Sequence, residues 1–310
     1  MAVKTNPAKY ILPLYINRLE GRMLFMPAPS KAGQEQLLFI YGHHSNLERW
    51  WGLMQILNSL GSVTMPDLPG FGGMDSFYKI GEKPSIDTMA DYLAAFFRLR
   101  FRHKRVIVVG MGYGFVLITR MLQRYPELKK NVKLLVSIGG VADSEDFSFS
   151  KSKKLVYSYV TGLFARRLPA SVFKVMALNG PMIRLVYAKT SKVHHKTVAL
   201  QEPINLKILH DVEVGLWHGN DLRTYMYTTN EFLKFSNCDR RVDLPVHYVS
   251  AKKDHLIDHN RIEQHMRVIF TDFHPYFINS NGYASTLIAS RKEAAGLIPK
   301  DLVRIIRGMS

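Results

Sequence analysis

Residue types that could support acyl transfer occur in this chain at several separate places. His43, His44 and Ser45 follow one apolar run, and Asp254 follows another. Between them, the run 105–109 leads into a glycine-rich segment, Gly110-Met111-Gly112-Tyr113-Gly114. Covalent acyl transfer requires a nucleophile, a base that takes its proton and an acid that orients the base. These segments are therefore the candidates for a site, although the middle of the glycine-rich segment carries no side chain.

The composition is that of a folded globular protein. The chain has 310 residues, of which 47% are hydrophobic and 22% charged, and this length fits two domains or one α/β domain with an insertion. One cysteine, Cys238, excludes an internal disulfide framework and a multi-cysteine zinc site. The longest uncharged apolar stretch, residues 106–119, is interrupted by three glycines and is too short to span a bilayer. We therefore expect a cytoplasmic protein.

The elements that must position these residues alternate between short apolar runs and longer amphipathic ones. A turn is expected at 19–21, and a capping box formed by Ser45 and Glu48 predicts the start of a helix that Gly61 ends. Asp87 is the expected cap of the next helix. Strands are predicted at 11–16, 23–26, 37–41, 63–65, 105–109 and 132–138, and helices at 45–60, 86–104 and 115–124. This alternation predicts βαβ units and a mostly parallel sheet.

The alternation stops after residue 140 and resumes near residue 245. Residues 141–235 contain mainly helical patterns, at 155–166, 171–178, 183–188, 208–216 and 222–235. A strand at 245–250, a helix at 260–270, a strand at 276–279 and a terminal helix at 302–306 follow. The sequence thus predicts a core at 1–140 and 236–310, with a helical cap inserted at 141–235.

With these elements in order, the chain resembles the α/β-hydrolase family. That family places its nucleophile in the middle of a small-x-nucleophile-x-small turn between a strand and a helix, and residues 110–114 match the frame. Tyr41-Gly42-His43-His44 resembles the family's oxyanion loop, and Asp67-Leu68-Pro69-Gly70-Phe71-Gly72 its D-x-P-G-x-G loop. The resemblance puts Asp254 at the catalytic acid and Tyr283 at the histidine. A dinucleotide-binding reading of the glycines fails because G-x-G-x-x-G needs a different spacing.

Two positions depart from the family pattern. Gly112 stands at the nucleophile and cannot form an acyl-enzyme, and Tyr283 stands at the histidine with an ordinary pKa near 10, which makes a poor base at neutral pH. In a model serine protease, losing either group costs on the order of a millionfold in turnover. Glycine also relieves the strained backbone conformation of this turn. Asp254 would then have no imidazole to orient.

What the resemblance leaves intact is the binding space in front of the turn. The backbone N–H groups of His43 and Tyr113 are expected to form an oxyanion-hole-like pair, with His44, Ser45 and Trp51 as pocket residues. Two alternatives stay open: Ser45 only caps a helix, and bulky aromatic residues plug the old site. The remaining histidines, His194, His195, His210, His255, His259 and His274, are expected at the surface or away from the pocket. Their spacing supports no metal site, and no cofactor is expected.

The charge is strongly uneven. With 42 Lys and Arg against 25 Asp and Glu, the formal net charge is +17, and residues 151–210 hold eleven of these cations and a single acid, Glu202. Apolar and aromatic residues alternate with the cations, which is typical of a segment that lies on anionic lipid or an acidic protein. A solvated basic surface is the plain alternative. Nucleic acid binding is disfavoured because no nucleic-acid-binding motif accompanies the charge.

These observations favour a pocket-bearing binding or scaffold protein that has lost hydrolase chemistry, with a small hydrophobic or acyl-type ligand. The alternative is a hydrolase of ester or lipid-like substrates that uses unconventional catalytic groups. A lyase or a cofactor-free oxygenase in the same pocket is a third class. We expect the protein in the cytoplasm, either free or peripheral to a membrane.

Overall fold

One eight-stranded sheet organises the chain. A computed structural model describes residues 6–29, 35–178, 181–183, 206–252, 254, 256–279 and 291–308. The strand order is β1-β2-β4-β3-β5-β6-β7-β8; β1, β2 and β4 pair antiparallel, and all other neighbours pair parallel. The strands are β1 (Ile11–Ile16), β2 (Leu19–Met26), β3 (Glu35–Ile40), β4 (Gly61–Pro66), β5 (Val106–Met111), β6 (Val132–Ile138), β7 (Val242–Ala251) and β8 (Phe270–Ile278).

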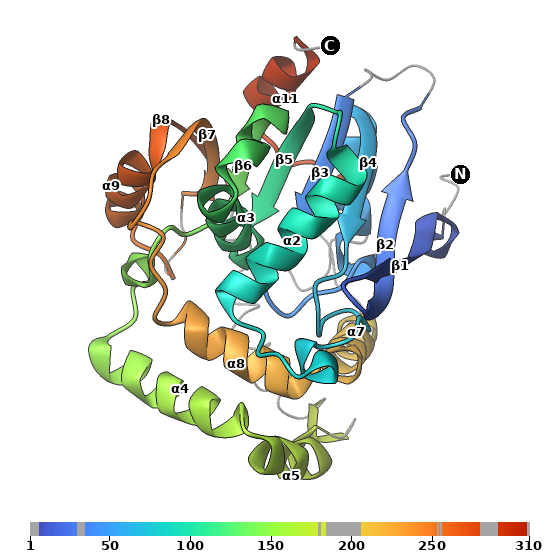
Figure 1. Ribbon diagram of the computed structural model, residues 1–310, viewed down its shortest axis with the longest axis vertical. Helices are drawn as coiled ribbons and strands as arrows, with labels where there is room; N and C mark the ends of the chain where they lie inside the picture. Colours follow the sequence, from blue (N-terminus) through green and yellow to red (C-terminus); the bar gives the residue numbers. More distant parts are fainter. Residues whose placement is uncertain are drawn as a thin grey trace.

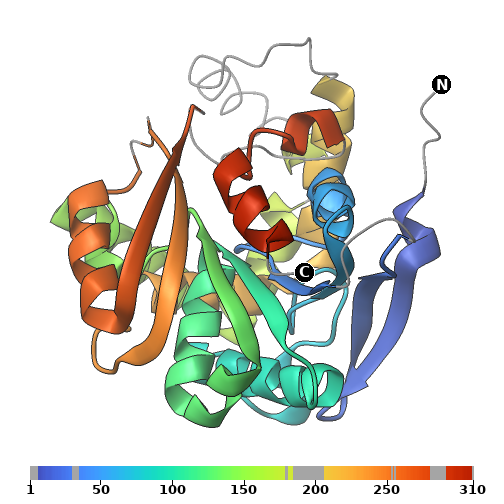
Figure 2. The ribbon, with the colours of Figure 1, turned by 90° about the horizontal axis from the view of Figure 1, so that it is seen from above.

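Helices cover both faces of this sheet. Figure 2 shows α2 and α3 on one face and α1, α10 and α11 on the other. The described helices are α1 (Trp51–Asn58), α2 (Ile86–Phe101), α3 (Tyr113–Arg124), α4 (Lys151–Phe164), α5 (Arg167–Ala177), α7 (Leu206–Gly219), α8 (Leu222–Phe232), α9 (His259–Ile269), α10 (Arg291–Ala294) and α11 (Lys300–Arg307). The predicted architecture, a mostly parallel sheet flanked by helices, is confirmed.

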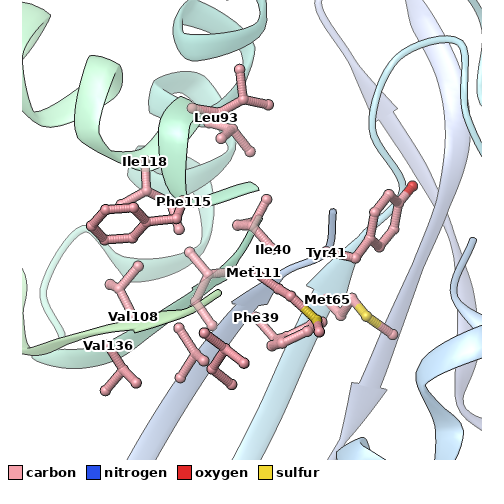
Figure 3. Close-up of a cluster of buried hydrophobic side chains, with 14 of the residues drawn as sticks. Phe39, Ile40, Tyr41, Met65, Leu93, Val108, Met111, Phe115, Ile118 and Val136 are labelled. Atoms are coloured by element: carbon pink, nitrogen blue, oxygen red, sulfur yellow. The ribbon is translucent and has the colours of Figure 1, made fainter. Parts of the chain in front are cut away.

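The core lies between the central strands and the helices beside them. Every residue of β4 and of β5 is buried, which explains why the sequence of β5 reads as a continuous apolar run rather than an alternating one. Figure 3 shows Val108 of β5 and Phe115 and Ile118 of α3 in one cluster of side chains. Each such side chain contributes about 1.5–3 kcal/mol when fully removed from water. This cluster fixes α3 against the sheet.

The first hairpin turns earlier than the sequence predicted. Asn17 and Arg18 form the turn, both with positive φ (50° and 65°), and β2 begins at once with Leu19, which is fully buried and pairs with Ile16. The prediction of a turn at 19–21 was therefore wrong. Two-residue hairpin loops favour positive φ because their twist then matches that of the strands, and this requirement outweighed the glycine signal at Gly21.

Both predicted helix caps were also wrong. Ser45 is buried and its hydroxyl accepts a hydrogen bond from Trp50 Nε1 (2.7 Å), so it caps no helix, and α1 begins only at Trp51 after a single 3₁₀ turn. Glu48, the other half of the expected capping box, pairs with a strand residue instead. The cap of α2 is Ser85, which accepts from Thr88 N, whereas Asp87 lies inside the first turn. Gly61, expected to end the first helix, is the first residue of β4.

The helices α4, α5, α7 and α8 lie between β6 and β7 in the chain, where the inserted cap was predicted. In Figure 1, α4 and α5 lie at the edge of the molecule, with α8 between α4 and the rest of the protein. A small apolar cluster of their own holds them together, built around Ala170, Leu222 and Met226. The predicted helix at 183–188 falls mostly outside the described residues. The domain boundaries at 140 and 236 remain an interpretation.

A buried carboxylate holds the loop that follows β4. Asp67 is fully buried, and its oxygens accept hydrogen bonds from Arg22 Nε (3.1 Å) and from the Tyr41 hydroxyl (2.9 Å). The chain wraps around this carboxylate at Gly72, where φ is 62° and a Cβ atom would lie 2.1 Å from Asp67 Oδ1. The loop 67–72 is therefore shaped by its aspartate, which connects β2, the end of β3 and the loop.

Burial raises the pKa of Asp67 to about 8. At pH 9, where this carboxyl group is ionised, we expect Arg22→Gln to lower the free energy of unfolding by about 3 kcal/mol, because it leaves the buried carboxylate without its charged partner. The control is Arg304→Gln, which breaks an ion pair with Asp301 between side chains that are 79% and 73% exposed and should cost less than about 1 kcal/mol. Urea unfolding measures both. Equal losses would contradict a special role for the buried pair.

Candidate functional site

A sharp turn joins β5 to α3 at the carboxyl edge of the sheet. Gly112 is its central residue, with φ 49° and ψ −117°, a conformation that side chains other than glycine adopt only under strain. Its N–H donates to Ile138 O (3.1 Å) at the end of β6, and its carbonyl accepts from Phe115 N (3.1 Å) in α3. The strand-to-helix elbow predicted from the sequence is therefore present, and its apex carries only hydrogen.

The three glycines of the elbow have different reasons to be glycine. A Cβ atom on Gly110 would lie 2.6 Å from Phe115 Cα, and one on Gly114 would lie 2.3 Å from Ile40 O. These two positions are closed by backbone atoms. At Gly112 the nearest atom among the described residues is Gly42 Cα, at 4.0 Å. Space is therefore available at the apex, and the backbone conformation alone favours glycine there.

The loop after β3 faces this elbow. Ile40 of β3 pairs with Gly110 of β5 in parallel register, so the carboxyl ends of the two strands lie side by side, and residues 42–43 lie opposite the apex. Tyr113 is the first residue of α3, so its N–H has no acceptor within the helix. A helix N-terminus with free N–H groups attracts a partial negative charge. The start of α3 therefore keeps a partial positive charge at the elbow even without a nucleophile.

The side chain of His43 is surrounded by aromatic rings. Its ring centroid lies 4.7 Å from Tyr225, 5.2 Å from Tyr113, 5.4 Å from Phe71 and 6.3 Å from Phe232. Removal from water, the larger cause, and the neighbouring His44 together lower the pKa of His43 to about 3. The imidazole is therefore neutral at physiological pH.

A hydrogen bond fixes the direction in which this imidazole donates. His43 Nε2 lies 2.6 Å from Thr228 Oγ1 in α8, and the same hydroxyl lies 2.8 Å from Thr224 O. The carbonyl oxygen can only accept, so the Thr228 proton goes to it and His43 Nε2–H donates to Thr228. His43 therefore does not take the Thr228 proton, and Thr228 is fully buried. In a nucleophile–base pair the hydroxyl donates its proton to the imidazole, whereas here the imidazole donates to the hydroxyl.

His44 connects the same loop to α7. Its Nδ1 lies 3.1 Å from Asn220 Nδ2, and the amide orientation is fixed because Asn220 Oδ1 accepts from Gly72 N (2.8 Å). His44 Nε2 faces Glu213 Oε1 at 3.5 Å. Burial raises the pKa of Glu213, but the neighbouring His44 and Arg49 lower it by more, so the net shift is downward. The sequence did not single out Glu213, because nothing in the local pattern of α7 distinguishes it from a surface acid.

The other predicted pocket residues lie differently. Ser45 uses its hydroxyl for Trp50, as described above. Trp51 is buried, with its ring centroid 5.7 Å from that of Tyr10 near the first strand. The structure therefore brings His43, His44, Gly112 and Tyr113 together, and the contacts given for Ser45 and Trp51 are with other parts of the chain.

At the predicted acid and histidine positions the structure describes only one residue. Asp254 follows β7 as expected, and its Oδ1 accepts from Leu256 N (2.9 Å). Tyr283 lies outside the described residues, as do His255, His194 and His195. A second carboxylate, Asp146, was missed: it is fully buried, accepts from Ala142 N (2.7 Å) and lies 2.6 Å from His265 Nδ1. The only sequence signal that could have identified Asp146 as a candidate is its position shortly after β6.

One further hydroxyl approaches an imidazole. Ser250 Oγ, at the end of β7, lies 3.5 Å from His259 Nδ1, and Ser250 is fully buried. His259 is partly exposed and packs its ring against Phe277, with ring centroids 5.7 Å apart; its expected place away from the pocket stays a prediction. The distance is at the limit of a hydrogen bond.

Comparison with solved structures identifies the architecture. A membrane phospholipase A described as a bacterial virulence factor superposes with a TM-score of 0.66 at 16% identity, over 96% of this chain and 86% of that one. A hydrolase from Oleispira antarctica gives 0.64 at 12%, over 92% and 94%. A serine-to-glycine mutant of the N-acyl homoserine lactonase AidH, complexed with N-hexanoyl homoserine lactone, gives 0.62 at 16%, over 97% and 98%. No family model matches the sequence, and no curated protein does. The protein has the α/β-hydrolase fold, as its sequence predicted.

Alanine substitution can separate the reasons why each elbow position is glycine, because each reason predicts a different loss in the free energy of unfolding. Gly112→Ala should cost about 1–3 kcal/mol, from its positive φ alone. Gly73→Ala, at φ 86° with no described atom within 4 Å of a Cβ, is the matched control and should cost a similar amount. Gly114→Ala should cost about 3 kcal/mol or more, because its Cβ would overlap a backbone carbonyl. A loss at Gly112 as large as that at Gly114 would show that the apex is filled.

The neutral state of His43 predicts a pH dependence of stability. Between about pH 6.5 and 3 the unfolded chain binds a proton at this histidine and the folded chain does not, so the free energy of unfolding falls as the pH falls. From pH 7 to pH 5 the wild type should lose about 2 kcal/mol more than His43→Gln. Exposed His103 gives the control, His103→Gln, which should follow the wild type. Denaturant titrations at the two pH values provide the measurement, and parallel curves for all three proteins would contradict the assignment.

Proposed function

We propose that this protein binds a small acyl-type ligand at the elbow and does not hydrolyse it through the elbow residue. One observation carries the proposal: the apex of the strand-to-helix turn is Gly112, which has no side chain, and a Cβ atom at that position would lie no closer than 4.0 Å to a described atom. The ligand oxygen would accept hydrogen bonds from backbone N–H groups at the start of α3, including that of Tyr113. No covalent intermediate can form at residue 112.

The surrounding side chains support binding over proton transfer. Burial and the neighbouring His44 lower the pKa of His43 to about 3, which makes it a weak base, and its Nε2–H donates to Thr228, so Nε2 does not take a proton from that hydroxyl. The Tyr113 hydroxyl is buried and has no hydrogen-bond partner among the described residues. An unpaired buried hydroxyl costs about 1–3 kcal/mol, and a ligand acceptor atom would recover this loss. Aromatic rings from α8 and from the loops provide apolar contact for an acyl chain.

The solved structures with this fold include enzymes, and their likeness to this chain extends to the fold alone. Among them, the AidH variant with serine replaced by glycine holds N-hexanoyl homoserine lactone. By analogy, a protein of this fold in which glycine replaces a serine can hold an acyl lactone. This comparison suggests an acyl lactone or an acyl ester as the first class of ligand to test.

The alternative function, hydrolysis by unconventional groups, rests on two buried contacts between an aliphatic hydroxyl and an imidazole. These pairs are Thr228 with His43 and Ser250 with His259; a third contact joins the phenol of Tyr276 to His247 at 3.0 Å. Both aliphatic hydroxyls are fully buried, and the proton of Thr228 is engaged by a carbonyl. These features favour binding over catalysis.

The test compares the wild type with Gly112→Ser and with the double variant Gly112→Ser, Tyr283→His. We expect no fluorophosphonate labelling and no p-nitrophenyl ester turnover by the wild type, and calorimetric binding of N-hexanoyl homoserine lactone or p-nitrophenyl butyrate. Tyr113→Phe should weaken that binding by about fivefold to a hundredfold if its hydroxyl meets the ligand.

Labelling of the wild type would contradict the proposal. In that case Thr228→Val and Ser250→Ala would identify the responsible hydroxyl, because only the variant lacking it would lose the label. Failure of the wild type to bind any of these esters and lactones would contradict the binding function, and the elbow would then be a plugged remnant.

A further inference from the structure

The outer face of α4 and α5 is apolar where a surface helix is normally polar. On α4 the exposed residues include Val156, Tyr159, Val160 and Leu163, at helical spacing. On α5 they are Leu168, Val172, Val175 and Met176, which recur at i, i+4, i+7 and i+8 and so form one stripe. Their exposed fractions reach 74% at Tyr159, 78% at Leu168, 78% at Val175 and 70% at Met176. We call these eight residues the outer stripe.

The opposite side of α4 is polar and faces α8. Asn230 of α8 donates from Nδ2 to Thr161 Oγ1 (3.0 Å), and the same nitrogen lies 3.2 Å from Ser158 Oγ. Thr161 is buried, whereas Tyr159, two residues before it in sequence, is exposed. Apart from Phe164 at its end, which packs against the small apolar cluster, α4 therefore turns polar side chains to its neighbour, whereas an ordinary surface helix buries its apolar side. Contacts among the described residues do not account for the stripe residues Val156, Tyr159, Leu168 and Val175, which stay more than half exposed.

Cations accompany the outer stripe, and acids do not. Residues 151–178 contain no Asp or Glu and six cations: Lys151, Lys153, Lys154, Arg166, Arg167 and Lys174. A second copy of this face would bring six like charges against six. Residues 184–205 of the same chain carry four cations and one acid, so their net positive charge would also be repelled by the cations of this face. The complementary surface must be anionic as well as apolar.

A hollow of about 400 Å³ lies between α4 and α8 next to the outer stripe. Leu155, Tyr159 and Leu163 line its apolar part, and Arg166 and Lys234 contribute its charges. Lys234 Nζ donates to Asn230 Oδ1 (2.7 Å), a neutral partner. Two cations beside an apolar wall match the chemistry of a lipid phosphate with its attached acyl chains.

We propose that the outer stripe docks on the surface of an anionic lipid bilayer, with a lipid phosphate between Arg166 and Lys234. The apolar side chains would enter the boundary between headgroups and acyl chains. Lysine and arginine would extend their charged ends to the headgroups, and Tyr157 and Tyr159 would lie at the interface, as amphipathic side chains do. No described helix is long and apolar enough to cross a bilayer, so the contact is peripheral. An acidic protein is the competing partner, but an apolar stripe along two outward-facing helices fits an extended lipid surface better.

The experiment is co-sedimentation of the full chain with phosphatidylcholine vesicles, with and without phosphatidylglycerol, at low and high salt. We expect binding only to the vesicles that contain phosphatidylglycerol, and weaker binding in high salt. Leu168→Gln should reduce the affinity about tenfold, and Arg166→Gln and Lys234→Gln about fivefold each. Leu99→Gln is the matched control, because Leu99 is 66% exposed on α2, away from this face. Lys83→Gln is the control for charge, at an exposed lysine.

Several outcomes would overturn the proposal: equal binding to both kinds of vesicle, no binding to either, or stripe variants that bind as the wild type does. Self-association in the absence of lipid, lost in Leu168→Gln, together with no vesicle binding, would assign the face to a second copy. Capture by an acidic polypeptide such as polyglutamate, with no vesicle binding, would assign it to protein. Circular dichroism verifies that each variant is folded. Gly112→Ser should bind vesicles as the wild type does, which separates this result from the elbow's function.

Discussion

The close contact between the end of β3 and the start of α3 determines the shape of the site. Gly114 lies against the carbonyl of Ile40 and Gly110 against Phe115, so that neither glycine has room for even one additional carbon. This contact sets the direction in which α3 leaves the sheet. It also brings the loop at residues 42–43 opposite the turn. The free N–H groups at the start of α3 and the space at Gly112 both follow from it.

Gly112 differs from these two neighbours because packing does not require it. Its conformation is one that a catalytic side chain would occupy under strain, and glycine occupies it without strain. The fold is therefore stable without a nucleophile, and the structural and chemical roles of the elbow are separable. Solved enzymes with the same fold and 12–16% identity show that the architecture is compatible with catalysis. They do not show that this chain performs it.

Proximity of a hydroxyl to an imidazole does not make a catalytic pair, and the surroundings of His43 show why. The aromatic rings remove water from the imidazole and keep it neutral, and the carbonyl of Thr224 takes the threonine proton. The histidine is thereby a donor. The environment also matters on the outside of the protein, where α4 makes polar contacts with α8 and exposes apolar side chains to solvent. In both places the environment of the group, rather than its type, determines what it can do.

The sequence by itself determined the order of elements, the parallel sheet, the position of the elbow and the identity of its apex, because apolar runs and glycine spacing are local signals. It also located the basic, apolar segment between β6 and β7. The side-chain contacts were decided by the tertiary structure, because a local sequence pattern holds no information about them. Ser45 matched a helix cap but is bound by Trp50, because burial brought an indole N–H to it. The sequence did not single out Glu213 or Asp146, because the histidines that face them, His44 and His265, come from distant segments. Packing likewise decided that the apolar residues on α4 and α5 face solvent rather than a core. Helical spacing predicts that such residues form a stripe, but it does not predict which way the stripe faces.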